Sequence, residues 1–98
     1  MSGMTNAVRR VLHEAGHQEA RGDSLWGFLA TPGTTPGIVR LSYVRAPDVR
    51  KREGSVRFGN DRVSEYVRVL QSNGFRCSRI SGVGRSVDTL LIFLRQSS

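Results

Sequence analysis

The sequence predicts an α+β domain: a two-layer sandwich in which two helices cover one face of a mostly antiparallel sheet. The chain has 98 residues, enough for one modest core but not for two, so residues 1–98 are expected to form a single domain. Apolar residues recur at helical spacing in two stretches, and strand-like runs follow each stretch. The resulting order, helix–strands–helix–strands, predicts that both helices pack on the same sheet.

A third observation is an echo within the chain. The motif Arg-Val-Leu-x-x-x-Gly occurs at 10–16 and again at 68–74. Between 8–21 and 66–79, five of fourteen positions are identical, where background usage predicts about one. The echo therefore indicates two similar half-units, each a helix that ends at a glycine and turns into a strand.

The first helix is predicted from Thr5 to Ala15. Thr5 or Asn6 can cap its start, and Gly16 is expected to close its end. Its apolar side recurs at helical spacing in Val8, Val11, Leu12 and Ala15.

Three extended segments are expected next, at 17–21, 25–31 and 38–45. The last two flank residues 32–37, whose two Pro-Gly pairs predict a tight reversal and hence a β-hairpin. In the second hairpin strand alternate residues share a face, so one side is expected to be buried through Val39, Leu41 and Tyr43.

The second half is predicted to begin with a basic surface loop over 46–59, because the hydrophobic pattern lapses there and Pro and Gly occur. The second helix is expected to start at Asn60, a residue type favoured as an N-cap. Its apolar stripe contains Val63, Tyr66 and Leu70. Asn73-Gly74 ends it.

Two further strands are predicted at 75–80 and 87–95. The run 90–94 is apolar throughout, which is typical of a central strand or of one covered on both faces. The predicted core consists of Val11, Leu12, Trp26, Phe28, Leu41, Tyr66, Leu70, Leu91 and Phe93.

The net charge is +7, and arginine supplies fourteen of the fifteen basic residues. The planar guanidinium fits phosphate and stacks on bases, so this composition favours a nucleic-acid partner, DNA or RNA. The alternative explanation of the high arginine content is codon bias in a GC-rich genome. The basic stretch between 45 and 62 includes one aromatic residue, and a flexible loop of this kind could follow a phosphate backbone. The alternative interpretation is a solvated loop whose charges are partly paired. The candidate nucleic-acid-binding residues are Arg45, Arg50, Lys51, Arg52, Arg57, Phe58 and Arg62.

One short motif suggests an enzyme. His13-Glu14-Ala15-Gly16-His17 has the H-E-x-x-H spacing in which two histidines one helical turn apart bind Zn²⁺ and the glutamate activates water. The stretch up to Asp23 resembles a zincin active site, which implies metalloprotease activity. If Gly16 ends the helix, however, His17 leaves the helical face and the two imidazoles do not converge. We therefore expect no metal, no cofactor and no catalytic residue.

Other classes are excluded by simple counts. Cys77 is the only cysteine, so an intrachain disulfide cannot form. The longest apolar run has five residues, against the ~20 that span a bilayer, and the N-terminus lacks the apolar core of a signal peptide. The sequence thus predicts a cytoplasmic protein with no membrane partner and no evident small-molecule substrate.

The leading hypothesis is a small basic, non-enzymatic binding or regulatory module that contacts nucleic acid through phosphates. The alternative is a protein–protein interaction module, such as a homodimer, because exposed edge strands and the apolar 90–94 strand are surfaces that partners commonly bury. The sequence contains no helix-turn-helix, zinc finger or ribonucleoprotein motif.

Overall fold

The computed structural model of the chain describes residues 3–20, 26–35, 37–46, 54–84 and 86–94. These form two helices and four strands in the predicted order. The elements are α1 (Gly3–Glu14), β1 (Gly27–Pro32), β2 (Ile38–Val44), α3 (Ser55–Ser72), β3 (Phe75–Ile80) and β4 (Thr89–Leu94).

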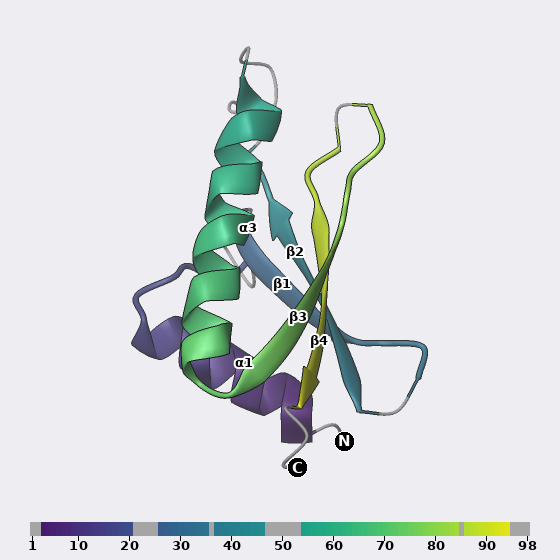
Figure 1. Cartoon of the computed structure of the whole chain (residues 1–98). Coiled ribbons are helices and arrows are strands. Elements are labelled where there is room, and N and C mark those ends of the chain that lie inside the picture. Colours follow the sequence, from purple (N-terminus) through teal and green to yellow (C-terminus); the bar gives the residue numbers. More distant parts are fainter. Residues whose placement is uncertain (1–2, 21–25, 36, 47–53, 85, 95–98) are drawn as a thin grey trace.

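The four strands make one antiparallel sheet in the order β1-β2-β4-β3, so β4 is central, as its apolar sequence predicted. Both helices pack on the same face of this sheet, which confirms the predicted α+β sandwich (Figure 1). One core lies between the two layers. Its fully buried side chains are Val8, Leu12, Phe28, Val39, Leu41, Val63, Leu70, Leu90 and Ile92, with Tyr66 almost completely buried.

Both helices end as the echo predicted. Gly16 adopts φ 89°, its N–H donates to the His13 carbonyl at 3.0 Å, and the next N–H donates to the Leu12 carbonyl at 3.0 Å. These two bonds are the Schellman arrangement, in which a left-handed residue satisfies the last free carbonyls of a helix. Gly74 follows α3 with φ 86° and donates to the Gln71 carbonyl.

The predicted strand at 17–21 is wrong. In its described part, the segment makes a single parallel bridge, between Glu19 and Phe28, and two backbone hydrogen bonds to β1. It runs beside the start of β1 as a short edge segment and does not become a full strand.

The predicted start of the second helix is also wrong. Helix α3 begins at Ser55, five residues before Asn60, and its N-cap is Gly54 without a side-chain capping bond. Gly59, whose presence favoured a loop, lies within the helix against the Val87 side chain, where a Cβ would not fit. The residues 54–59 of the predicted loop are thus a helix start, while 47–53 lie outside the described part of the chain.

Asn60 has a different role from capping. Its side-chain oxygen accepts a hydrogen bond from the Asp88 backbone N–H at 2.8 Å. The Arg79 guanidinium donates to Asp88 at 2.7 Å, to Ser64 at 2.8 Å and to the Asn60 carbonyl at 3.0 Å. The Gly82 N–H and Arg79 both bond the Asp88 carboxylate and hold its pKa below the ordinary value. These hydrogen bonds link Arg79 of β3 and Asp88 to α3.

Three residues that were predicted to be in the core lie outside it. Leu91 and Phe93 lie on the sheet face away from the helices, because Leu90 and Ile92 take the buried positions of β4. The run 90–94 has no polar residue to mark its outer side, so its register could not be inferred. The Trp26 residue is 43% exposed at the start of the first hairpin strand. Val11 is partly buried, and the other predicted core residues are buried.

Candidate nucleic-acid interface

Four of the seven predicted basic-cluster residues are described, and they lie where β2 ends and α3 begins. Arg45 follows β2 and donates a hydrogen bond to the Ser55 hydroxyl at 2.9 Å. Arg57 and Phe58 occupy the first turn of α3 with exposed side chains. Arg50, Lys51 and Arg52 are outside the described residues.

Phe58 and Arg62 form a stacked pair on α3. They are four positions apart and therefore share one side of the helix. The Arg62 guanidinium carbon is 5.3 Å from the centre of the Phe58 ring, a cation–π geometry. Arg62 also donates to the Glu65 carboxylate at 3.2 Å. Phe58 remains 42% exposed, so part of its ring is available to a partner.

A small cavity borders this pair and was not predicted from the sequence. It has a volume of about 150 Å³. Its walls come from the segment that follows α1, the residue before β1, the end of β2 and the middle of α3. The lining residues are Gly16, His17, Gln18, Trp26, Tyr43, Arg62 and Tyr66.

Aromatic rings pack edge to face around Tyr66. The His17 ring lies 4.9 Å from the Tyr66 ring at an interplanar angle of 84°. The Tyr43 ring is 6.4 Å from Tyr66 and 6.1 Å from Phe58. Tyr43 thus connects the cavity to the exposed Phe58–Arg62 pair. The Schellman turn fixes this arrangement, since Gly16 redirects the chain so that His17 reaches α3.

The ionisable groups of the cavity are mostly neutral. Burial lowers the pKa of His17, reinforced by the Arg62 charge and opposed by the Glu65 carboxylate. Burial also raises the pKa values of Tyr43 and Tyr66. The cavity therefore presents an imidazole and two phenol groups beside one permanent positive charge, that of Arg62.

The H-E-x-x-H stretch has a different geometry from a zinc site. Because α1 ends before Gly16, His17 lies beyond the helix and packs on Tyr66. The His13 imidazole bonds to Glu19 at 2.8 Å. Although burial opposes it, hydrogen bonds from Arg9 and His13 hold the pKa of Glu19 below its ordinary value. Within the described ranges, no three His, Cys, Asp or Glu residues are grouped to hold a metal; Asp23 lies outside them.

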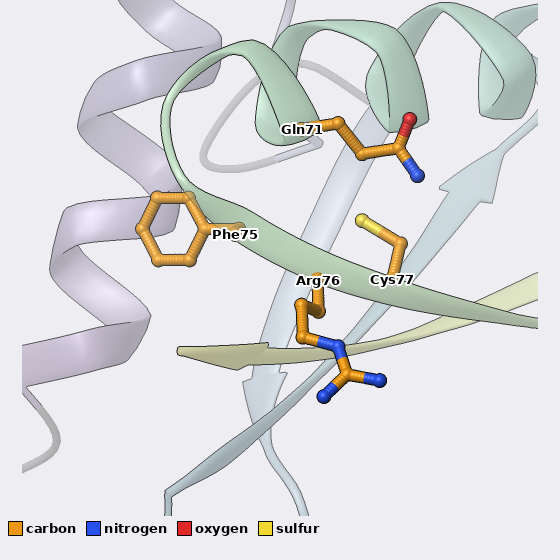
Figure 2. Close-up of a pocket in the computed structure, with 4 residues that line it drawn as sticks. All are labelled: Gln71, Phe75, Arg76 and Cys77. Carbon is orange, nitrogen blue, oxygen red and sulfur yellow. The ribbon is translucent and has the colours of Figure 1, made fainter. Parts of the chain in front are cut away.

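A second hollow, of about 370 Å³, lies beside the end of α3 and is shown in Figure 2. Its lining residues are Gln71, Phe75, Arg76 and Cys77. Gln71 and Cys77 point toward each other, whereas the Arg76 guanidinium lies on the other side of β3. Burial raises the pKa of Cys77, which keeps the thiol protonated and weakly nucleophilic. The chemical groups of this hollow do not converge.

The chain matches no known protein family, curated protein or solved structure. Neither described helix combines the length and hydrophobicity needed to cross a membrane.

Sequence reasoning found Arg62 and Phe58 but missed the cavity beside them. The sequence placed Trp26 and Tyr66 in the predicted core, and for His17 it predicted only a departure from the face of the first helix. These residues come from segments far apart in the chain. The repeated motif was the one sequence signal that bore on the cavity. It assigned Gly16 to a helix end and thereby predicted that His17 does not continue α1.

Proposed function

We propose that the protein is a small non-enzymatic module that binds nucleic acid, chiefly through phosphates, with its interface on the first half of α3. The observation that carries this proposal is the exposed Phe58–Arg62 pair with Arg57 beside it. Arginine and aromatic side chains together are typical of surfaces that bind single strands, where cations contact phosphates and rings stack on bases.

The charge distribution supports the proposal. Two described arginines form ion pairs that link separate parts of the fold: Arg9 with Glu19, and Arg79 with Asp88. Arg57, in contrast, is exposed and has no ion-pair partner among the residues that the structure describes. Arg62 keeps donors that its single bond to Glu65 does not use.

The test is binding of a labelled single-stranded oligonucleotide, measured by fluorescence anisotropy as a function of salt. We expect binding at about 50 mM salt and a steep loss of affinity as salt rises, because phosphate contacts release counterions. The double variant Arg57→Ala/Arg62→Ala should flatten the plot of log affinity against log salt by about 1.4, which is about 0.7 per lost contact.

Arg76→Ala is the matched control. It removes the same charge from β3, where Arg76 is exposed on the sheet face opposite the helices. It should change the slope by less than the α3 variants do. Absence of binding at low salt, or an equal effect of Arg76→Ala, would contradict an interface on α3. Circular dichroism would verify that every variant is folded.

A second candidate function is protein–protein interaction through the uncovered sheet face. No helix in the described part of the chain covers this face. Five apolar side chains remain partly or largely exposed on it: Leu29, Ile38, Ile80, Leu91 and Phe93. Such a surface is typical of an interaction site.

Light scattering between about 1 and about 100 µM tests self-association, since specific pairs commonly have micromolar affinity or better. A rising mass would favour a homodimer. A constant monomer mass would argue against it.

A further inference from the structure

We infer that the cavity beside His17 binds one base of a single-stranded nucleic acid, a pyrimidine-sized ring. This inference rests on the proposed function and makes it more specific, because it adds a base contact to the phosphate contacts. The size of the cavity, its lining and its position next to the stacked pair support it.

The size of the cavity suits a ligand of one ring. Its volume is about 150 Å³. A cavity of this size accommodates a single small ring such as benzene, whereas sites for drug-sized molecules have about 300–1,000 Å³. A six-membered base fits that volume, with the attached sugar and phosphate remaining outside.

The lining offers both of the interactions that recognise an unstacked base. Trp26 contributes an indole that is 43% exposed, and bases of single strands stack on such aromatic side chains. The Tyr43 and Tyr66 residues are only 8% and 2% exposed. Neither hydroxyl has a hydrogen-bond partner among the described residues, and neither oxygen is sealed from solvent, so each can bond to a ligand.

The hydrogen-bonding groups suit a neutral, polar ring. The edge of a pyrimidine carries both donors and acceptors, as phenol hydroxyls do. An apolar ring would offer no partner to either hydroxyl, while an anionic ligand would find one fixed positive charge among the described lining residues, that of Arg62. A base therefore matches this lining better than either alternative.

The position of the cavity connects it to the proposed phosphate contacts. Arg62 lines the cavity and also stacks on Phe58. A strand with one base in the cavity would place its neighbouring phosphates close to Arg62, and a neighbouring base close to the exposed Phe58 ring. One side of α3 would thus contact base and backbone together.

The experiment compares a short oligo(dT) with an abasic oligomer of the same length, which has the same phosphates but no bases. Trp26 is the only tryptophan of the chain, so intrinsic fluorescence reports directly on the cavity. Oligo(dT) should quench it saturably and bind about 5- to 100-fold more tightly than the abasic oligomer, as expected for one stacked base.

Tyr43→Phe removes one hydroxyl and leaves the ring in place. It should weaken oligo(dT) binding about 2- to 10-fold and leave abasic binding unchanged. Arg76→Ala, on the opposite sheet face, should leave the ratio of the two affinities unchanged.

The outcomes separate this inference from the proposed function. Equal affinity for the two oligomers, or no change in Trp26 fluorescence, would overturn the base site while leaving phosphate binding intact. Failure of both oligomers to bind at about 50 mM salt would overturn the proposed function as well.

Discussion

The two halves of the chain occupy equivalent places in the fold but end their helices in different surroundings. Each half consists of a helix and two strands, with β2 and β4 paired in the centre of the sheet and β1 and β3 at its edges. After Gly74 the chain enters β3 at once. After Gly16 it instead passes beside the start of β1, making one bridge, and places His17 on α3. The candidate base cavity lies where the first half departs from the second.

This difference depends on a close approach of two backbone segments. Gly27 begins β1 with φ 126°, and a Cβ at this position would overlap the Gln18 carbonyl oxygen. Only glycine lets the edge segment come this near. The Phe28 N–H then donates to the Gln18 carbonyl at 2.9 Å. At Gly74 a Cβ would meet open space. The halves share a helix-ending glycine, whereas among the described residues the segment that follows the helix is approached this closely only in the first half, at Gly27.

The largest expected effects come from the leucines that the echo aligns, Leu12 and Leu70. Both are completely buried and both lie four residues before the helix-ending glycine. Leu12→Ala and Leu70→Ala should each lower the free energy of unfolding by about 2–5 kcal/mol, because each leaves a cavity in the core. Chemical denaturation measures both.

Similar losses from the two variants would support the equivalence of the half-units. A loss below about 0.5 kcal/mol for either one, the range of surface substitutions, would remove that helix from the shared core. The exposed Arg10 and Arg68, also aligned by the echo, provide matched surface controls as alanine variants.

The overall fold could be predicted because its signals are local. The 3.6-residue spacing on both helices, the Pro-Gly pairs of the hairpin and the capping glycines each act over a few neighbouring residues. The register of β4 could not be predicted, since five consecutive apolar residues leave both faces equally favourable. The start of α3 was missed because Gly59 indicated a turn, while its actual role is to let the helix approach Val87.

The candidate site was less predictable for the same reason. Phe58 and Arg62 belong to one helix, so their pairing follows from spacing alone. His17, Trp26 and Tyr43 meet only through the path of the chain after Gly16 and the order of the strands. Neither the path of the chain after Gly16 nor the strand order can be read from sequence spacing. The cavity could therefore be found only in the folded structure.

Two glycine variants, one in each half of the chain, are expected to have smaller effects on stability. Gly27→Ala introduces a side chain at a left-handed position where the Gln18 carbonyl already lies. It should cost about 1–3 kcal/mol of stability, the range for a strained backbone position. It should also displace residues 17–20, and with them one wall of the cavity. Gly74→Ala, at φ 86° with open space around it, should cost about 1–2 kcal/mol from backbone strain alone.

The distinguishing readout is Trp26, which precedes Gly27 and lines the cavity. Gly27→Ala should change the intrinsic fluorescence of the folded protein and weaken quenching by oligo(dT), because the wall formed by His17 and Gln18 moves. Gly74→Ala should leave both signals as in the parent protein despite its loss of stability. If the two variants behaved alike, the close approach at Gly27 would not shape the cavity, and the departure of the first half from the second would have no bearing on binding.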